Sequence, residues 1–169
     1  MMSYGEYMAR HVKRIETNRL VLRGINENDT EKIVEWRSDP KVYMYFKAPH
    51  RISIKEHLNW FHSVYLENDN RFDWICIEKD SGKRIGVFGL YREEMTAEVN
   101  YILAPEARHK GYATESIKCL VDFASKNWNC KYIIAEIHQD NKSSIALVEK
   151  LGYKIISCNG SFIVYRIEV

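Results

Sequence analysis

Residues 97–115 read AEVNYILAPEARHKGYATE, and this stretch decides how the chain is expected to fold. Residues 97–103 alternate in polarity, which is typical of a strand with one buried face. A short turn with Pro105 and three basic residues follows, and Gly111 opens a helix. The buried side of this predicted helix consists of apolar residues at helical spacing: Ile117, Leu120, Val121 and Ala124. The stretch therefore predicts a strand, a basic turn and a helix in direct succession.

The basic turn has the features of a phosphate site. Arg108, His109 and Lys110 give it positive charge, and a helix start adds unpaired backbone N–H groups and a partial positive charge. Gly111 and the small Ala113 would let a pyrophosphate approach the backbone closely. Neither GxxxxGK[ST] nor GxGxxG occurs, so a nucleoside triphosphate or dinucleotide site of those types is disfavoured. A purely structural turn is the alternative interpretation.

The rest of the chain predicts a mixture of strands and helices. Further strands are expected at residues 20–25, 72–78, 84–91, 132–138, 153–156 and 162–168. Further helices are expected from Asp29 to about Ser38, from Ser53 to Tyr65 and from Asn141 to Leu151. This order indicates an α/β (α+β) fold, with a mixed central sheet of about seven strands flanked by about four helices. No linker divides the chain, so we expect an N-terminal extension, residues 1–15, and a single domain, residues 16–169.

The second of these predicted helices has a clear start. Ser53 and Glu56 have the spacing of a capping box. Four apolar residues then recur at helical spacing and predict an amphipathic helix with one buried face: Ile54, Leu58, Phe61 and Tyr65.

The composition limits the kinds of partner. The 169 residues are 46% hydrophobic and carry a net charge of +2, so a globular domain is expected and nucleic acid is not. No apolar run approaches the ~18 residues of a membrane span. The N-terminus lacks the apolar block of a secretory signal, and the scattered cysteines form no CxxC pair: Cys76, Cys119, Cys130 and Cys158. We therefore expect a cytoplasmic protein that binds no metal and no membrane.

Three motifs resemble those of the GNAT N-acetyltransferases. Residues 108–113, RHKGYA, match the acetyl-CoA signature R/Q-x-x-G-x-G/A. Residues 141–144, NKSS, followed by residues 149–153, EKLGY, resemble the second motif, N-x-x-S and then E-K-L-G-F. Residues 16–23, ETNRLVLR, resemble the T-x-R-L-x-L-R start of the branch that acetylates ribosomal protein N-termini. The resemblance covers residues 16 to 168.

This resemblance implies the GNAT fold, with acetyl-CoA in a splayed gap between the strands at 97–103 and 132–138. Backbone groups around Ile102 and Leu103 would pair with the pantetheine arm, and Asn141 would contact the arm from the other side. The pyrophosphate would be held by the loop that runs through Arg108, His109, Lys110, Gly111, Tyr112, Ala113 and Thr114.

Acetyl transfer to an amine needs a group that takes a proton and a group that gives one. Alternation places Glu98, Asn100 and Ile102 on one strand face, and Glu98 could take the amine proton; the alternative is a structural carboxylate. Many family members carry the acid as a Tyr directly before E-K-L-G-F, where this chain has Val148. The resemblance suggests Ser144 instead, with a helix-capping serine as the alternative.

The acceptor would meet the first two predicted helices. This region also resembles enzymes that acetylate amino-sugar nucleotides, and Arg37, His57 and Trp60 could bind a diphosphate or a sugar ring. The alternative is that Trp60 belongs to the core and His57 is a solvated helix residue. We expect an acetyl-CoA-dependent N-acetyltransferase acting on a primary amine, either a protein N-terminus or an amino sugar. A non-catalytic acyl-CoA-binding or sensing module is the alternative, and a homodimer stays open.

Overall fold

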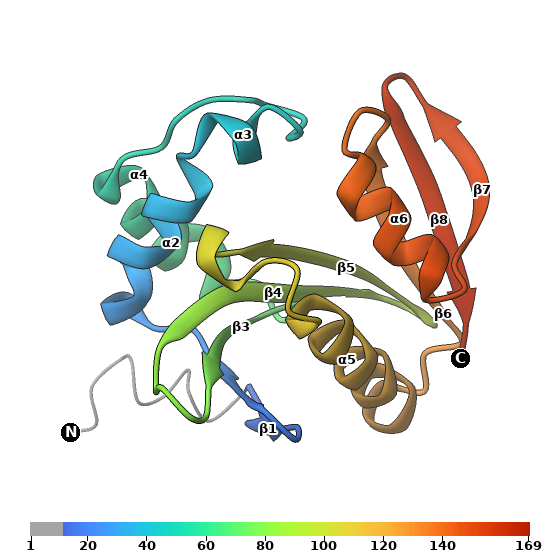
Figure 1. Ribbon diagram of the computed structural model, residues 1–169, viewed down its shortest axis with the longest axis horizontal. Helices are drawn as coiled ribbons and strands as arrows, with labels where there is room; N and C mark the ends of the chain where they lie inside the picture. Colours follow the sequence, from blue (N-terminus) through green and yellow to red (C-terminus); the bar gives the residue numbers. More distant parts are fainter. Residues whose placement is uncertain (1–11) are drawn as a thin grey trace.

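The computed structural model describes residues 12–169, which are built around one mixed sheet (Figure 1). Its strands are β1 (Ile15–Glu16), β2 (Leu20–Gly24), β3 (Arg71–Glu78), β4 (Arg84–Glu93), β5 (Thr96–Leu103), β6 (Tyr132–His138), β7 (Lys154–Asn159) and β8 (Phe162–Glu168). They lie in the order β1-β2-β3-β4-β5-β6-β8-β7. Neighbouring strands are antiparallel except β5 and β6, which are parallel. The predicted mixed α/β fold is confirmed.

Five α-helices and three short helical turns connect the strands within residues 12–169. The α-helices are α2 (Thr30–Arg37), α3 (Pro40–Tyr43), α4 (Ile54–Trp60), α5 (Tyr112–Trp128) and α6 (Lys142–Lys150). The short turns are η1 (Glu27–Asp29) and η3 (Pro105–Ala107), both 3-10 helical, and η2 (Phe61–Tyr65), a π-helix that continues α4. The predicted end of the first helix near Ser38 is confirmed. Pro40 starts α3, where a missing N–H costs nothing.

The strand and helix positions differ from the prediction at the N-terminus. β1 is an eighth strand, and its two residues pair with Val21 and Leu22, too short a segment to leave a periodic pattern. The predicted extension is described from Val12 onward, and its first eleven residues lie outside the described part. Val12 packs in the core, and the Trp74 indole donates to the Lys13 carbonyl at 2.8 Å.

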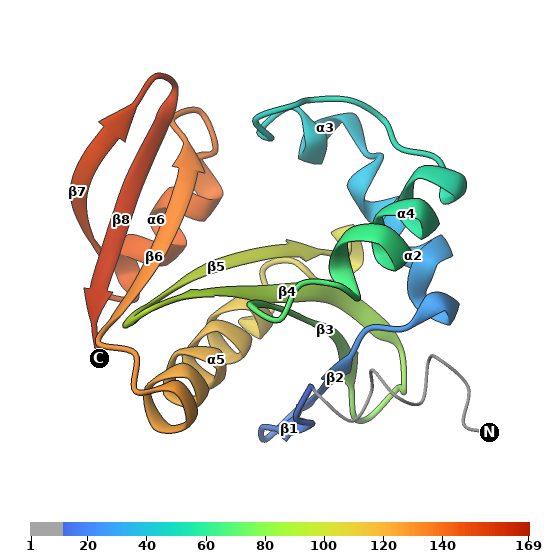
Figure 2. The same cartoon turned by 180° about the vertical axis from the view of Figure 1, so that it is seen from behind.

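The helices cover the two faces of the sheet unequally. α5 lies along one face, where Phe123 packs edge-on against Trp74 at 5.6 Å between ring centroids. α2 and α4 cover part of the opposite face, and α6 packs beside β6 at the C-terminal end (Figures 1 and 2). Side chains alternate between the two faces along a strand. In β5 the Val99 side chain therefore points to the face covered by α5, and those of Glu98 and Asn100 point to the face of α2 and α4.

The buried face of α4 differs from the predicted one. Ile54 is 46% exposed, whereas His57 is only 3% exposed, so Ile54 was wrongly placed in the core and the solvated position for His57 was wrong. The helix docks through His57, Phe61 and Tyr65, and the wider π-helical turn brings Phe61 and Tyr65 into a stack at 5.5 Å. Such turns occur frequently at functional sites.

Within residues 12–169, none of the helices combines the length and the apolar composition needed to cross a bilayer.

Candidate functional site

The sheet opens between β5 and β6. Thr96, Ala97 and Glu98 pair with residues 132–134 of β6, and no pair between the two strands follows in the described chain. The edge of β5 from residue 99 to residue 103 therefore faces a gap, as the wedge between β5 and β6 in Figures 1 and 2 shows. The predicted residues Ile102 and Leu103 lie on this edge. Backbone donors and acceptors along an unpaired strand edge can bind an extended ligand.

The basic loop lies where β5 passes into α5. Gly111 is its pivot, with φ of +81°, and His109 is also left-handed at +61°. A Cβ on Gly111 would stand 3.3 Å from Nη2 of Arg19. Only glycine takes this backbone conformation without strain, and it leaves the start of α5 open to an anion.

The members of the loop are not equally available. His109 and Lys110 are exposed, and Ala113 and Thr114 are half-buried in the first turn of α5. Arg108 turns back and donates to the Leu103 carbonyl from Nε and Nη2, both at 3.3 Å. Tyr112 is buried, and its hydroxyl bonds to the Glu78 carboxylate. Backbone N–H groups, His109 and Lys110 are thus the free part of the loop.

Arg19 supports this loop, a role that the sequence interpretation missed. Its Nη1 donates to the Lys110 carbonyl at 2.9 Å and its Nε to Glu115 at 2.7 Å. The guanidinium also lies 4.5 Å from the centre of the Tyr112 ring. Thr17 adds a 2.6 Å bond to Glu115. The signal was present, because Thr17 and Arg19 are the matched residues of the T-x-R-L motif.

On the other side of the gap, α6 begins with Asn141. The Asn141 side-chain oxygen accepts the Ser144 N–H at 3.3 Å and so caps the helix. Asn141 itself, and not the Ser144 hydroxyl, therefore does the capping. Val148, at the family's usual Tyr position, is completely buried. The start of α6 thus offers the gap an amide and a hydroxyl.

A second hydroxyl lies near Ser144. The Tyr101 hydroxyl is buried and has no hydrogen-bond partner within residues 12–169. Burial raises the pKa of Tyr101, and the nearby Ser144 hydroxyl partly opposes this rise. Tyr101 stacks on Phe88 of β4 at 5.7 Å, which fixes its ring. The sequence interpretation passed over Tyr101 because it looked like an ordinary core residue of an alternating strand.

Glu98 lies at the last residue pair before the gap. Its side chain stays accessible to solvent, but the surrounding protein removes part of its hydration and raises its pKa, and the charge of Glu136 raises it further. Lys47 and Arg71 act in the opposite direction. A carboxylate with a raised pKa is a better proton acceptor near neutral pH, so the position and environment of Glu98 suit a general base.

A cavity of about 220 Å³ lies between α2, α4 and the sheet. The three predicted acceptor residues, Arg37, His57 and Trp60, all contribute to its walls. The remaining lining comes from the strands and loops around them: Ile25, Ile33, Phe46, Arg71, Asp73, Val87, Asn100, Tyr101 and Ile102. Because Asn100 and Ile102 share a face of β5 with Glu98, the cavity continues the face that carries the candidate base.

His57 is a neutral group in the wall of this cavity. Burial and the positive charge of Arg37 lower its pKa to about 4, against a small opposite effect of Asp29. Neither ring nitrogen has a hydrogen-bond partner within residues 12–169. The ring stands 5.3 Å from Trp60, which in turn lies 4.9 Å below the Arg71 guanidinium.

Asp73 is a buried carboxylate at the floor of the cavity. It is 3% exposed, and Oδ2 accepts from Arg71 Nε at 2.9 Å. Burial raises the pKa of Asp73, while Arg71 and Arg37 oppose the rise. Gly89 makes room for it, because a Cβ there would lie 2.1 Å from Oδ1. The sequence interpretation missed Asp73, because the strand register that places it opposite Gly89 is not visible in the sequence.

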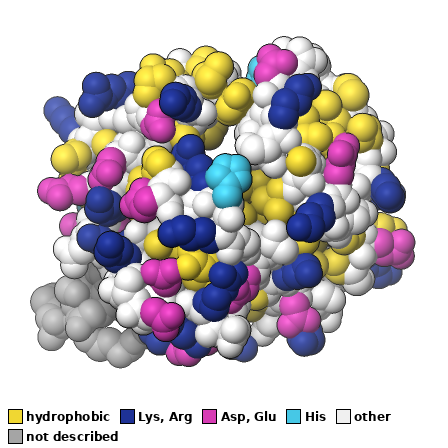
Figure 3. Space-filling view, viewed as in Figure 1, with side chains coloured by type: hydrophobic (Ala, Val, Ile, Leu, Met, Phe, Trp, Pro, Cys, Tyr) yellow, Lys and Arg dark blue, Asp and Glu magenta, His cyan; other side chains and the backbone are white. Residues whose placement is uncertain are grey.

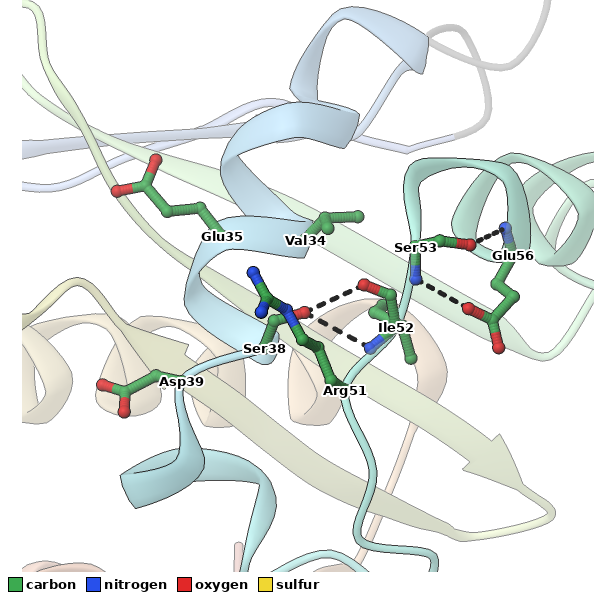
Figure 4. A pocket seen from close by; sticks show the side chains of 8 residues that line it. All are labelled: Val34, Glu35, Ser38, Asp39, Arg51, Ile52, Ser53 and Glu56. Carbon is green, nitrogen blue, oxygen red and sulfur yellow. Dashed lines mark hydrogen bonds between the residues drawn. The ribbon is translucent and has the colours of Figure 1, made fainter.

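A more open hollow of about 560 Å³ lies outside the cavity, between α2 and the start of α4 (Figure 4). Its walls carry Glu35, Asp39 and Glu56 and none of the predicted site residues. Ser38 donates to the Ile52 carbonyl at 3.0 Å and accepts from its N–H at 3.3 Å. These two bonds fix the chain that enters α4, the helix that carries His57.

The described residues show no metal site and no disulfide. Within residues 12–169, no three His, Cys, Asp or Glu side chains lie close enough to hold a metal ion. Cys76, Cys119, Cys130 and Cys158 are free thiols. Lys and Arg side chains are interspersed with Asp and Glu over the face in Figure 3, without a continuous basic patch.

Comparison with known proteins identifies the family. The sequence model of the acetyltransferase (GNAT) domain matches residues 19–154. The uncharacterized N-acetyltransferase YoaA of Bacillus subtilis is 28% identical over 146 residues, which cover 83% of this chain and 82% of YoaA. The fold is similar to that of two acetyltransferases of known structure.

One is the spermidine N-acetyltransferase of Vibrio cholerae in complex with CoA and spermine, with a TM-score of 0.77, 21% identity and coverage of 90% of this chain and 96% of that one. The other is RimL, the ribosomal L7/L12 alpha-N-protein acetyltransferase in complex with CoA, with a TM-score of 0.79, 15% identity and coverage of 93% and 98%. Since the domain model spans the strand, basic loop and helix that border the gap in the sheet, this chain belongs to the GNAT N-acetyltransferase family.

Proposed function

We propose that the protein transfers an acetyl group from acetyl-CoA to a primary amine. The observation that carries the proposal is the position of Glu98. It stands where β5 and β6 separate, on the strand face that continues into the polar cavity. The basic loop lies at the far end of the same strand. One strand therefore connects a candidate phosphate site, a candidate base and a candidate acceptor cavity.

The residues around the gap fit acetyl-CoA. The left-handed Gly111 keeps the start of α5 open, and the first N–H groups of Tyr112, Ala113 and Thr114 would bind the pyrophosphate with His109 and Lys110. Arg108 would not bind the pyrophosphate directly. Its guanidinium is bonded to the Leu103 carbonyl, so it would hold the end of β5 in place. The free edge at Ile102 and Leu103 and the Asn141 amide would hold the pantetheine arm. Bound acetyl-CoA would supply the acetyl group as an activated thioester.

Glu98 and Ser144 divide the proton transfers between them. Glu98 takes a proton from the amine, because an ammonium has no lone pair with which to attack. Ser144 donates a hydrogen bond to the negative charge that develops on the departing sulfur. The neighbouring Tyr101 hydroxyl is a second donor for the same charge, since it is buried close to the Ser144 hydroxyl.

The acceptor occupies the cavity formed by Arg37, His57 and Trp60. A protein N-terminus and an amino-sugar nucleotide are the two acceptors that the sequence motifs favour. Both RimL and the Vibrio spermidine enzyme act on amines according to their names, which supports an amine acceptor in general. A cytoplasmic location and a homodimer stay predictions.

One observation favours a different function. Val148 fills the family's usual Tyr position and is completely buried, so the common proton donor is missing. A protein that binds acyl-CoA without transferring the acyl group would tolerate this change. Acetyl transfer is nevertheless the better explanation, because Glu98 and two hydroxyls remain beside the gap.

Free thiol release separates the two functions. We expect acetyl-CoA to release thiol only when an amine is added, in a panel of N-terminal peptides, amino-sugar nucleotides, polyamines and amino acids. Calorimetry with CoA is run in parallel. Binding of CoA together with no amine-dependent thiol release from the whole panel favours the sensing module. No binding of CoA at all contradicts both functions.

A further inference from the structure

The lining of the cavity contains two arginines, Arg37 and Arg71, and one carboxylate, Asp73. Among the described residues Arg37 makes no ion pair, and its Nε is buried without a hydrogen-bond partner. Its nearest aromatic contact is Phe46, 5.4 Å from the guanidinium. The only buried carboxylate in the lining, Asp73, is bonded to Arg71 at 2.9 Å. Asp73 and Glu56 attract the Arg37 guanidinium only from beyond ion-pair distance, and a half-buried guanidinium in this position is stabilised by binding a closer anion.

His57 adds a hydrogen-bond donor beside this charge. Its side chain is 3% exposed, and both nitrogens lack partners within residues 12–169 although the ring lines the cavity. A neutral imidazole carries one N–H and one lone pair. Leaving both unmatched in a buried position costs free energy, which a bound ligand would recover. Arg37 and His57 therefore form an unsatisfied donor pair in one wall.

The charge at the other end of the site has the opposite sign. Glu98 and Glu136 interact there, and Lys47 is the cation paired with Glu136. Asn100 lines the cavity and is two residues along β5 from Glu98, which corresponds to ~7 Å. The site is therefore basic where the acceptor would be anchored and acidic where its amine would react. A polyamine, which is cationic throughout, does not match this arrangement.

The size of the cavity restricts the acceptor further. Its volume of about 220 Å³ is below the range of about 300–1,000 Å³ that drug-sized ligands occupy. A volume of this size matches a group as small as an amino acid better than it matches a nucleotide. A guanidinium fork matches the planar geometry of a carboxylate through two parallel hydrogen bonds.

We propose that the acceptor is a small primary amine that carries a carboxylate. Arg37 and His57 bind the carboxylate, and the amine is directed towards Glu98. This inference rests on the proposed acetyl transfer and specifies its substrate class.

The test compares amino acids with their amides. Glycine, L-alanine, L-glutamate and 4-aminobutyrate are each assayed against the matching amide by thiol release, with rates corrected for the fraction of unprotonated amine. O-phosphoethanolamine, ethanolamine and spermidine complete the panel. We expect the carboxylate to increase kcat/KM about 10- to 100-fold, the effect of a charged hydrogen-bonded pair. Arg37→Gln should remove this preference by raising KM, with kcat little changed, and Arg37→Lys should restore part of it.

Lys32→Gln is the matched control, because Lys32 is an exposed cation of the same helix that pairs with Glu35 at 2.8 Å. His57→Asn is a second variant, and it keeps the experiment decisive if Arg37→Gln does not fold. Equal use of acids and amides, preference for spermidine, or a preference unaltered in both variants overturns the inference. If the enzyme prefers O-phosphoethanolamine to the amino acids, the subsite binds a phosphate, and the assignment of a carboxylate is overturned.

Calorimetry separates failure of the inference from failure of the proposed function. The titrations use glycine, L-glutamate and 4-aminobutyrate in the presence of CoA and require no turnover. Carboxylate binding that is lost in Arg37→Gln supports the subsite even in a protein without transferase activity. Absence of binding by all three acids overturns the subsite, even if other amines are acetylated.

Discussion

The Lys47 ammonium lies 2.7 Å from the Glu136 carboxylate and so connects the segment before α4 with β6. Two further contacts support this bridge: Tyr45 packs at 5.8 Å from His138, and Lys47 lies 5.8 Å from the Phe162 ring. The ion pair passes close to Glu98, whose pKa it lowers through Lys47 and raises through Glu136. Lys47 is thus placed to adjust the candidate base without contacting the acceptor cavity.

Replacing Lys47 should shift the acid side of the pH–rate profile. Lys47 lowers the pKa of Glu98, so Lys47→Gln should raise it, and Glu98 will then need a higher pH to be deprotonated. We expect the acid limb of kcat/KM to move to higher pH. Lys41→Gln, an exposed cation of α3, is the control. An acid limb that stays in place after Lys47→Gln contradicts the electrostatic link.

Removing the base itself should have a larger effect. Glu98→Gln is expected to lower kcat/KM about 10²- to 10⁴-fold near neutral pH, the usual contribution of a general base. The loss should shrink at high pH, where the amine loses its proton without help. Full pH–rate profiles of both proteins, with exposed Glu67→Gln as control, measure this. A small drop that is uniform across pH would assign Glu98 a structural role.

Gly111→Val tests the basic loop. A side chain at a φ of +81° is strained, and its Cβ would meet Arg19, so we expect acetyl-CoA affinity to fall at least tenfold. The strain also costs ~1–3 kcal/mol of stability. Gly82→Val is the matched control, because Gly82 has a φ of +68° with open space around it. Calorimetry should show normal affinity for Gly82→Val, and equal affinities in both variants would disprove the loop assignment.

The hydroxyls beside α6 should act on the chemical step. Ser144→Ala is expected to lower kcat with little change in the KM for acetyl-CoA, at a cost on the order of 2–4 kcal/mol. Tyr101→Phe should lower kcat as well, and the double variant should lose less than the sum if both hydroxyls serve one charge. The exposed Ser161→Ala is the control. If kcat is unchanged in both single variants, neither hydroxyl delivers the proton and water must do so.

Val148→Tyr should not rescue the rate, because Val148 is fully buried and a ring there overpacks the core.

His57 should make stability depend on pH. Its pKa is lowered from 6.5 to about 4 in the folded protein, so the unfolded chain takes up the proton first. The stability due to neutral His57 is complete above pH 6.5 and is lost as the pH falls to about 4. Between pH 6.5 and about 4, the free energy of unfolding should fall by on the order of 2–3 kcal/mol less in His57→Phe than in the wild type. Urea unfolding at several pH values measures this difference. A His57→Phe protein that keeps the wild-type dependence would contradict the low pKa.

The loop and the fold class could be predicted because their signals are local. Gly111 and its basic neighbours occupy consecutive positions, and the periodicity of each long element survives in the sequence. Asp73 could not be predicted as a site residue, since its burial depends on Gly89 in the adjacent strand. The Lys47–Glu136 pair joins residues 89 positions apart, and no local pattern encodes such a contact.

The α4 helix shows the opposite limitation. Ile54 has a good helical spacing to Leu58, yet it is exposed, whereas His57 is buried. Spacing identifies a helix but leaves its rotation open within about one residue, and here the Trp60 ring packs against His57. The burial of a polar residue is therefore hard to predict, because it occupies a position where an apolar side chain is expected.

Three residue pairs between β5 and β6 hold the two halves of the sheet together. On one side lie β1 to β5, and on the other lie β6, β8 and β7 with α6. Amide hydrogens along residues 99–103 that point into the opening have no ladder to protect them, so they should exchange with deuterium early. A molecule that spans the opening would bond to both β5 and β6. The two halves of the sheet should then unfold together, as one cooperative unit.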